Sequence, residues 1–263
     1  MAGLFFWRGP RVPVLSLRGI LSARAGALNI EAYGPLIDAA VKSAKDATLL
    51  LEIDSPGGSP VQSDLIAARL RRRADEHRVK LRAVVGEVGA SGGYWLACAA
   101  DEIVANPMSI VGSIGVVGGG FGFPDALSRL GIERRLYTAG EHKRRLDPFL
   151  PEKPDDLEFV RGLLDELHAR FKDWVRARRG VRLTADESAV FDGGYMLGER
   201  AITLGLVDRL GDLDTEVKAV GGSKARARNF KPRRRSLLSR LPRMLADALF
   251  DAAEERARPG FRM

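Results

Sequence analysis

A regular alternation of short apolar runs with helical patterns constrains the fold of this chain more than any other feature of its sequence. The apolar runs are rich in Val, Leu and Ile and cover residues 12–17, 48–53 and 81–88. Between them, residues 33–45 and 61–77 carry the 3.6-residue periodicity of amphipathic helices. Buried strands joined by crossover helices form a largely parallel sheet with helices on its faces. The sequence therefore predicts an α/β fold.

The chain continues this pattern less regularly after its first hundred residues. We expect a helix over 94–100, strands over 110–117 and 134–138, a long helix over 154–179 and a helical segment near 197–204. With 263 residues, of which 45% are apolar and 29% charged, the chain fits one large globular domain or one domain with an appendage.

The end of the chain differs in charge from the rest. The 263 residues include 42 Lys and Arg against 34 Asp and Glu, and residues 223–263 hold 12 of the basic and 4 of the acidic side chains. The net charge of +8 therefore lies in this tail, and residues 1–222 are neutral. We predict one domain over 1–222, followed by a basic linker and an amphipathic helical tail over 223–263. The apolar face of that helix would consist of Leu237, Leu238, Leu241, Leu245 and Leu249.

Several classes of protein are excluded by composition. Cys98 is the single cysteine, and with three histidines it cannot supply a disulfide or a usual structural zinc site. The apolar residues 4–7 are followed by Arg8 and are too short for a secretory signal or a membrane span. We expect a cytoplasmic protein, whose basic tail either binds an anionic membrane surface or is merely solvated. Nucleic acid is not an expected partner, because the basic residues 224–240 include only one aromatic side chain, Phe230.

Two predicted strands end in glycine-rich turns, at the sheet edge where open α/β folds bind their ligands. The turns are DSPGG at residues 54–58 and GASGG at residues 89–93. The second matches the G-x-S-x-G pattern, which presents a serine, here Ser91, at the start of a helix. Backbone amides from two such turns are suited to an oxyanion hole. The alternative is that Ser91 only caps the helix over 94–100.

A nucleophilic serine needs a base, and the sequence offers few. His77 and His168 fall on predicted helices, where a solvated surface position is expected. His142 and Lys143 follow a predicted strand and remain as candidates. A lysine base must be neutral near pH 7, so burial has to lower its pKa from the free value of about 10.4. The alternative is a solvated run of basic residues over 143–145.

Seven short segments of the sequence occur in the same order as in a known protein family. They are DSPGG at 54–58, ASGGY at 90–94, AD at 100–101, GSIGV at 112–116, GEHK at 140–143, GERA at 198–201 and LGLVD at 204–208. With them the chain resembles the bacterial signal peptide peptidase A family, serine peptidases of the Clp protease/crotonase superfamily. The likeness covers about residues 12–213. It implies a Clp protease/crotonase-like parallel sheet with flanking helices.

The resemblance also implies a catalytic Ser/Lys dyad. By this likeness Ser91 is the nucleophile, Lys143 is the general base and Ser113 holds the lysine amine in place. His142 is the next choice of base. The expected oxyanion-hole donors are Gly92 and one of Gly57 and Gly58. The reaction that the resemblance implies requires no metal or cofactor. The substrates would be hydrophobic peptides, such as signal peptide remnants or unfolded segments. The enzyme would be a homo-oligomer.

Two departures from the family keep other functions open. Family members commonly have an N-terminal membrane anchor, which is not expected here, and Glu141 and His142 stand where smaller or aromatic residues are usual. One alternative is a crotonase-like acyl-CoA enzyme, in which Ser91 and Lys143 would be incidental. Another is a non-catalytic scaffold at a membrane. An α/β-hydrolase fits less well, because its histidine usually lies late in the chain and 95 residues follow His168.

Overall fold

The fold is built from eight strands and eight α-helices within residues 9–45, 47–184 and 186–232, the parts of the chain that a computed structural model describes. In chain order they are β1 (Arg11–Arg18), α1 (Ile30–Ser43), β2 (Thr48–Ser55), α2 (Pro60–His77), β3 (Lys80–Ala90), α3 (Gly92–Ala97), β4 (Glu102–Ala105), β5 (Ile110–Gly112), α4 (Pro124–Arg129), α5 (Pro154–Arg179), α6 (Glu187–Val190), β6 (Tyr195–Leu197), α7 (Gly198–Thr203), β7 (Arg209–Leu210), α8 (Leu213–Gly221) and β8 (Arg226–Phe230).

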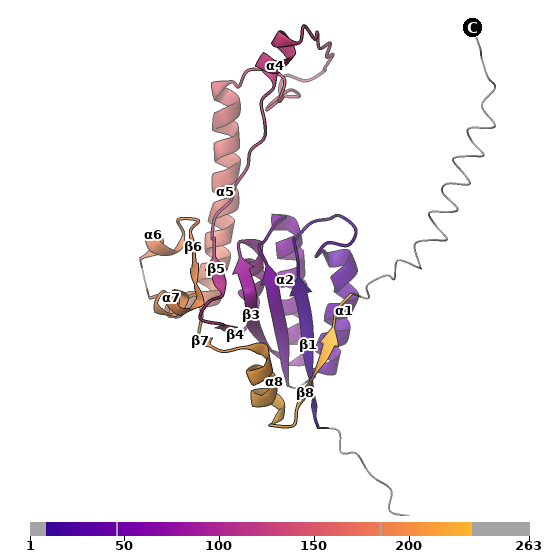
Figure 1. The fold of residues 1–263 in the computed structure, drawn as a ribbon, viewed down its shortest axis with the longest axis vertical. Coiled ribbons are helices and arrows are strands. Elements are labelled where there is room, and N and C mark those ends of the chain that lie inside the picture. The colour runs from indigo at the N-terminus through magenta and orange to yellow at the C-terminus, as the bar shows by residue number, and fades with distance from the viewer. Residues whose placement is uncertain (1–8, 46, 185, 233–263) are drawn as a thin grey trace, which may run out of the picture. The chain divides into compact units, whose positions relative to one another are not determined.

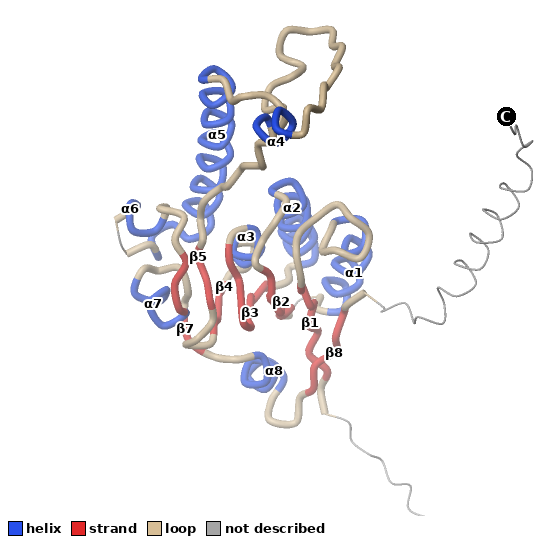
Figure 2. The backbone as a smooth tube through the Cα atoms, turned by 45° about the horizontal axis from the view of Figure 1, so that its top comes forward, coloured by secondary structure: helices blue, strands red, loops and turns tan. Residues whose placement is uncertain are grey.

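The strands form one mostly parallel sheet in the order β6-β5-β3-β2-β1-β8, which Figure 2 shows in red. β4 pairs with β3 and with β7, and these pairs are also parallel. Only the pair of β5 with β6 is antiparallel among the described strands. The crossover helices between β1, β2 and β3 confirm the predicted α/β fold.

Both faces of the central strands are buried, which explains their nearly continuous apolar sequence. Leu49, Leu51 and Ile53 of β2 pack against the core that α1 and α2 cover, behind the strands in Figure 1. Leu50 points to the opposite face, into a smaller core with Val217 of α8. The alternation along one strand thus supplies two separate cores.

Local signals set the ends of the helices. Asn29 caps α1 by accepting a hydrogen bond from the Ala32 amide at 2.8 Å, and Asp212 caps α8 through the Thr215 amide at 2.9 Å. α2 ends at His77, and the residue that caps it, Arg78, has a left-handed backbone with φ 53°. These local signals fix where the three helices begin or end.

Most predicted elements are confirmed, and three segments differ. Residues 134–138 form no strand, and the strand predicted over 110–117 ends at Gly112. Arg226–Phe230, placed in a linker by the sequence analysis, form the edge strand β8, parallel to β1. The pattern of apolar residues cannot show whether a neighbouring strand is present to accept the backbone hydrogen bonds. The predicted amphipathic helix lies in residues 233–263, outside the described residues.

In the parts of the chain that the structure describes, no helix is both long enough and apolar enough to cross a bilayer. α5 is the longest of the described helices, with 26 residues, and it carries charged side chains along its length.

Candidate active site

Ser91 lies at the sharp turn between β3 and α3. Its backbone has φ 52° and ψ −123°, a sparsely populated conformation for a residue with a side chain. The Ser91 amide donates to the Gly112 carbonyl at 2.8 Å, and the Ser91 carbonyl accepts from the Trp95 amide at 2.9 Å. The side chain makes no capping hydrogen bond to α3. The turn therefore holds the hydroxyl outside the helix, and the interpretation of Ser91 as a helix cap is wrong.

The turn after β2 lies directly against Ser91. A Cβ atom built on Gly57 would lie 2.9 Å from Ser91 Oγ and 2.7 Å from the Gly92 nitrogen. Gly57 also has φ 103°, which favours glycine. The two glycine turns thus meet as the sequence predicts, and only a residue without a side chain fits at their contact.

The amides of these turns differ in their hydrogen bonds. The Gly57 amide donates to Ser55 Oγ at 3.2 Å. Within the described residues, the Gly58 amide has no hydrogen-bond acceptor. The Gly92 amide is the first of α3 and has no partner within that helix. Gly58 and Gly92 are therefore the turn residues whose N–H groups are open to a ligand.

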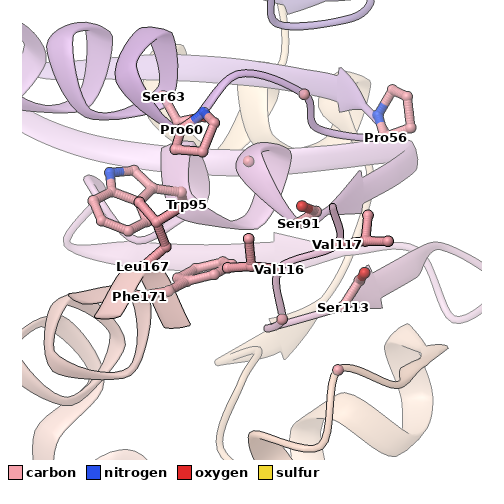
Figure 3. A pocket seen from close by; sticks show the side chains of 14 residues that line it. Pro56, Pro60, Ser63, Ser91, Trp95, Ser113, Val116, Val117, Leu167 and Phe171 are labelled. Carbon is pink, nitrogen blue, oxygen red and sulfur yellow. The ribbon is translucent and has the colours of Figure 1, made fainter. Parts of the chain in front are cut away.

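A cavity of about 430 Å³ opens beside Ser91. It brings together four of the residues predicted for the site, namely Ser91, Ser113, Gly58 and Gly92. Ser113 follows β5 with φ 52°, and its amide donates to the Gly194 carbonyl at 2.6 Å. Figure 3 shows the two serine side chains at the same end of the cavity.

The opposite end of the cavity is apolar and comes largely from α3 and α5. Trp95, Leu167 and Phe171 gather there in Figure 3. The rings of Trp95 and Phe171 have centroids 5.1 Å apart. His168 Nε2 lies 2.9 Å from the Ile114 carbonyl oxygen and joins α5 to the segment after β5. The expectation of a solvated His168 is therefore wrong. The sequence shows the helical periodicity of α5 but not which segments pack against this helix.

The C-terminal end of α3 is held by arginines from two other helices. Arg178 of α5 donates to the Cys98 carbonyl at 2.8 Å, and Arg71 of α2 donates to the Ala99 carbonyl at 3.0 Å. Inside the same core, burial raises the pKa of the Cys98 thiol to about 12. Cys98 therefore stays protonated and is no competing nucleophile near pH 7.

Lys143 does not line the cavity in this chain. It is exposed, in a series of turns between α4 and α5, and His142 beside it is also exposed. Arg145, two residues further on, contacts Asp156 in the first turn of α5. The cavity residues Leu167 and Phe171 lie 11 and 15 positions later, roughly 17 to 22 Å along the helix at about 1.5 Å per residue. The structure thus brings together the predicted serines and glycines but not the predicted base.

The mostly parallel sheet, with two glycine turns at its edge, is of the Clp protease/crotonase class of α/β folds. A sequence model described as Peptidase family S49 matches residues 73–225, more than half of the chain and both β3 and α5. The chain therefore belongs to peptidase family S49. This confirms the resemblance to signal peptide peptidase A that the sequence motifs indicated.

Several curated proteins are similar to this chain over part of their length. A protein of Brucella abortus named Na(+)/H(+) antiporter NhaA is 40% identical over 94% of this chain and 36% of its own length. A putative protease of Synechocystis is 33% identical over 65% of this chain and 61% of its own length. The probable protease SohB of Haemophilus influenzae is 33% identical over 63% and 46%. The chain thus spans about a third of the Brucella protein.

Proposed function

We propose that this protein is a serine endopeptidase in which Ser91 and Lys143 form a catalytic dyad. The observation that carries the proposal is the strained turn at Ser91. This turn holds a hydroxyl that caps no helix at the edge of a cavity, beside two open backbone amides. Membership of peptidase family S49 supports peptide-bond hydrolysis as the reaction. A helix cap or a packing residue would need neither the strain nor the open amides.

The reaction that this arrangement supports is acyl transfer to serine. Ser91 Oγ attacks the substrate carbonyl carbon and gives its proton to the neutral amine of Lys143. The negative oxygen that forms accepts hydrogen bonds from the amides of Gly58 and Gly92. Collapse of this intermediate breaks the peptide bond, and the leaving amine takes the proton from Lys143. Water then hydrolyses the acyl-enzyme by the same route.

The base comes, in this proposal, from a second copy of the chain. Lys143 is exposed near the first turns of α5, whereas the cavity at Ser91 lies three to four turns further along that helix. The segment around Lys143 also exposes large apolar side chains, which favours contact with another protein surface. They include Phe121, Leu130, Ile132 and Tyr137. A homo-oligomer would cover this surface and bring Lys143 to the Ser91 of its neighbour, with Ser113 holding the amine.

The substrate class follows from the apolar end of the cavity. Trp95, Leu167 and Phe171 offer a subsite for an apolar side chain next to the scissile bond. Hydrophobic segments, such as signal peptide remnants or unfolded protein, satisfy this requirement. The proposed reaction uses no metal or cofactor.

Four variants and one mixture test the proposal with a fluorogenic apolar peptide. Ser91→Ala and Lys143→Arg should be inactive, since a guanidinium keeps its proton above pH 12 and cannot act as a base. His142→Ala should keep most of the activity. Ser91→Ala mixed with Lys143→Ala should regain activity, because a mixed oligomer contains sites with both groups. Full activity of pure Ser91→Ala would refute the nucleophile, and a mixture that stays inactive would refute the shared site.

A further inference from the structure

The backbone around Lys143 forms a run of consecutive turns. The amide of Lys143 donates to the Gly140 carbonyl at 3.2 Å, and the amide of Arg145 donates to the His142 carbonyl at 3.3 Å. The amide of Asp147 in turn donates to the Arg144 carbonyl at 3.3 Å. Because each turn shares residues with the next, the place of Lys143 depends on where Arg145 is held.

Arg145 fastens this run of turns to α5. Its Nε lies 3.4 Å from Asp156 Oδ1, and its guanidinium carbon lies 4.3 Å from the centroid of the Phe159 ring. The side chains of Arg145 and Asp156 are 25% and 16% exposed, so water screens this ion pair less than an open surface pair. The charge of the Arg145 guanidinium thus contacts Asp156, and its flat face contacts the Phe159 ring about one turn later on the same helix.

The other arginine contacts of this region do not reach α5. Arg134 pairs with Asp147 and lies 4.6 Å from the centroid of the Phe149 ring, within the connection between α4 and α5. Arg135 pairs with Glu133, and both side chains are more than 70% exposed. Among the described ion pairs, the contact of Arg145 with Asp156 is the one that ties the turns to α5.

The far end of α5 is fixed to the helix that follows Ser91. Trp174 Nε1 donates to the Trp95 carbonyl at 3.0 Å, and Arg178 donates to the Cys98 carbonyl at 2.8 Å. Phe171, Val175 and Arg179 are buried. A continuous helix therefore connects the anchored turns around Lys143 with the helix that follows the proposed nucleophile.

We propose that Arg145 is a positioning residue, which sets the place of Lys143 by anchoring its turns to Asp156 and Phe159 of α5. This inference rests on the proposed function, in which Lys143 is the base. It assigns a role in the reaction to a residue that is not required to contact the substrate. Because a displacement of about 1 Å can cost roughly a hundredfold in rate, loss of the anchor should appear mainly in kcat.

Charge reversal on the full chain tests the anchor. Arg145→Glu and Asp156→Arg should each lower kcat for an apolar fluorogenic peptide by tenfold to about a hundredfold, with KM changed less than threefold. The double variant should recover at least tenfold over either single variant, because it restores an opposite-charge pair. A role only in overall stability would instead appear as a lowered thermal unfolding temperature of the single variants. Thermal unfolding of all variants should stay within a few degrees of the wild type.

Two matched controls separate the anchor from general effects of charge. Asp155→Arg changes charge in the same first turn of α5 and should keep kcat within threefold of the wild type. Arg135→Ala removes an arginine from the same connection, and it should also keep kcat within threefold. If Lys143→Ala is inactive, two results would overturn the anchor: an unchanged kcat in Arg145→Glu, or a double variant with no higher kcat than the single variants. An active Lys143→Ala would instead overturn the proposed function itself.

Discussion

Gly57 shows at the scale of one residue how tightly the proposed site is built. An alanine there would need φ near 103°, and its Cβ would lie within 3 Å of Ser91 Oγ, Ser91 Cβ and the Gly92 nitrogen. We expect Gly57→Ala to lower the free energy of unfolding by about 1 to 3 kcal/mol, as overpacking does, and to remove most peptidase activity. Urea unfolding and peptide hydrolysis measure the two effects.

Gly119→Ala is the matched control for this change. Nothing lies within 4 Å of a Cβ built on Gly119, and its φ is not in the left-handed range. Its stability and activity should equal those of the wild type. A Gly57→Ala variant as stable and as active as Gly119→Ala would show that the two turns do not meet as described.

Helix α8 illustrates, at the scale of an element, how charge holds a helix to the sheet. Glu216 is buried and accepts hydrogen bonds from Arg209 at 2.5 Å and from Arg82 at 2.8 Å. The Arg209 guanidinium, bonded to this carboxylate, holds the pKa of Glu216 below its ordinary value. The stabilisation is therefore fully present above the unfolded-state pKa of about 4.3 and is lost as the pH falls through the lower, folded-state pKa.

Glu216→Gln tests this interaction by its dependence on pH. At pH 7 the variant should lose about 1.5 to 3 kcal/mol of unfolding free energy, the range for hydrogen bonds to charged groups. Below about pH 4.3 the difference from the wild type should shrink, because the unfolded wild type takes up a proton there, while the folded carboxylate is protonated only at lower pH. Urea unfolding at several pH values measures it. A difference that is constant from pH 7 to pH 3 would contradict the role of the charge.

The sequence predicted the elements whose pattern is local and missed the features that depend on a distant partner. β1, β2, β3, α1, α2 and α5 follow from apolar periodicity. β8 has a basic, polar sequence and becomes a strand only because β1 is there to accept it. The glycines and Ser91 were predictable because tight turns restrict residue type. The position of Lys143 was not, because it depends on contacts with the start of α5 rather than on the GEHK motif.

For the molecule as a whole, the basic tail can be tested by truncation. Deleting 223–263, as the sequence boundary suggests, would remove strand β8, so the informative cut is after residue 232. Without residues 233–263 the protein should still cleave a short peptide, because this segment contains none of the proposed catalytic residues. It should bind vesicles of anionic lipid more weakly, since each Lys or Arg near such a surface contributes about 1 kcal/mol.

Salt gives the control for this truncation. Binding of the full chain should weaken as salt rises, because ions screen its attraction to the lipid. Vesicle sedimentation at low and high salt measures both proteins. If the full chain fails to sediment with anionic vesicles even at low salt, the tail has no such role.

The proposal of a Ser91/Lys143 dyad in the assembled protein is tested most directly by covalent labelling with a fluorophosphonate and mapping of the adduct by mass spectrometry. The wild type should carry one adduct per chain, on Ser91, and Ser91→Ala should carry none. Lys143→Ala should react at least about a hundredfold more slowly, the typical loss of a general base. An adduct on another residue, or equal labelling rates with and without the Lys143 amine, would contradict the dyad.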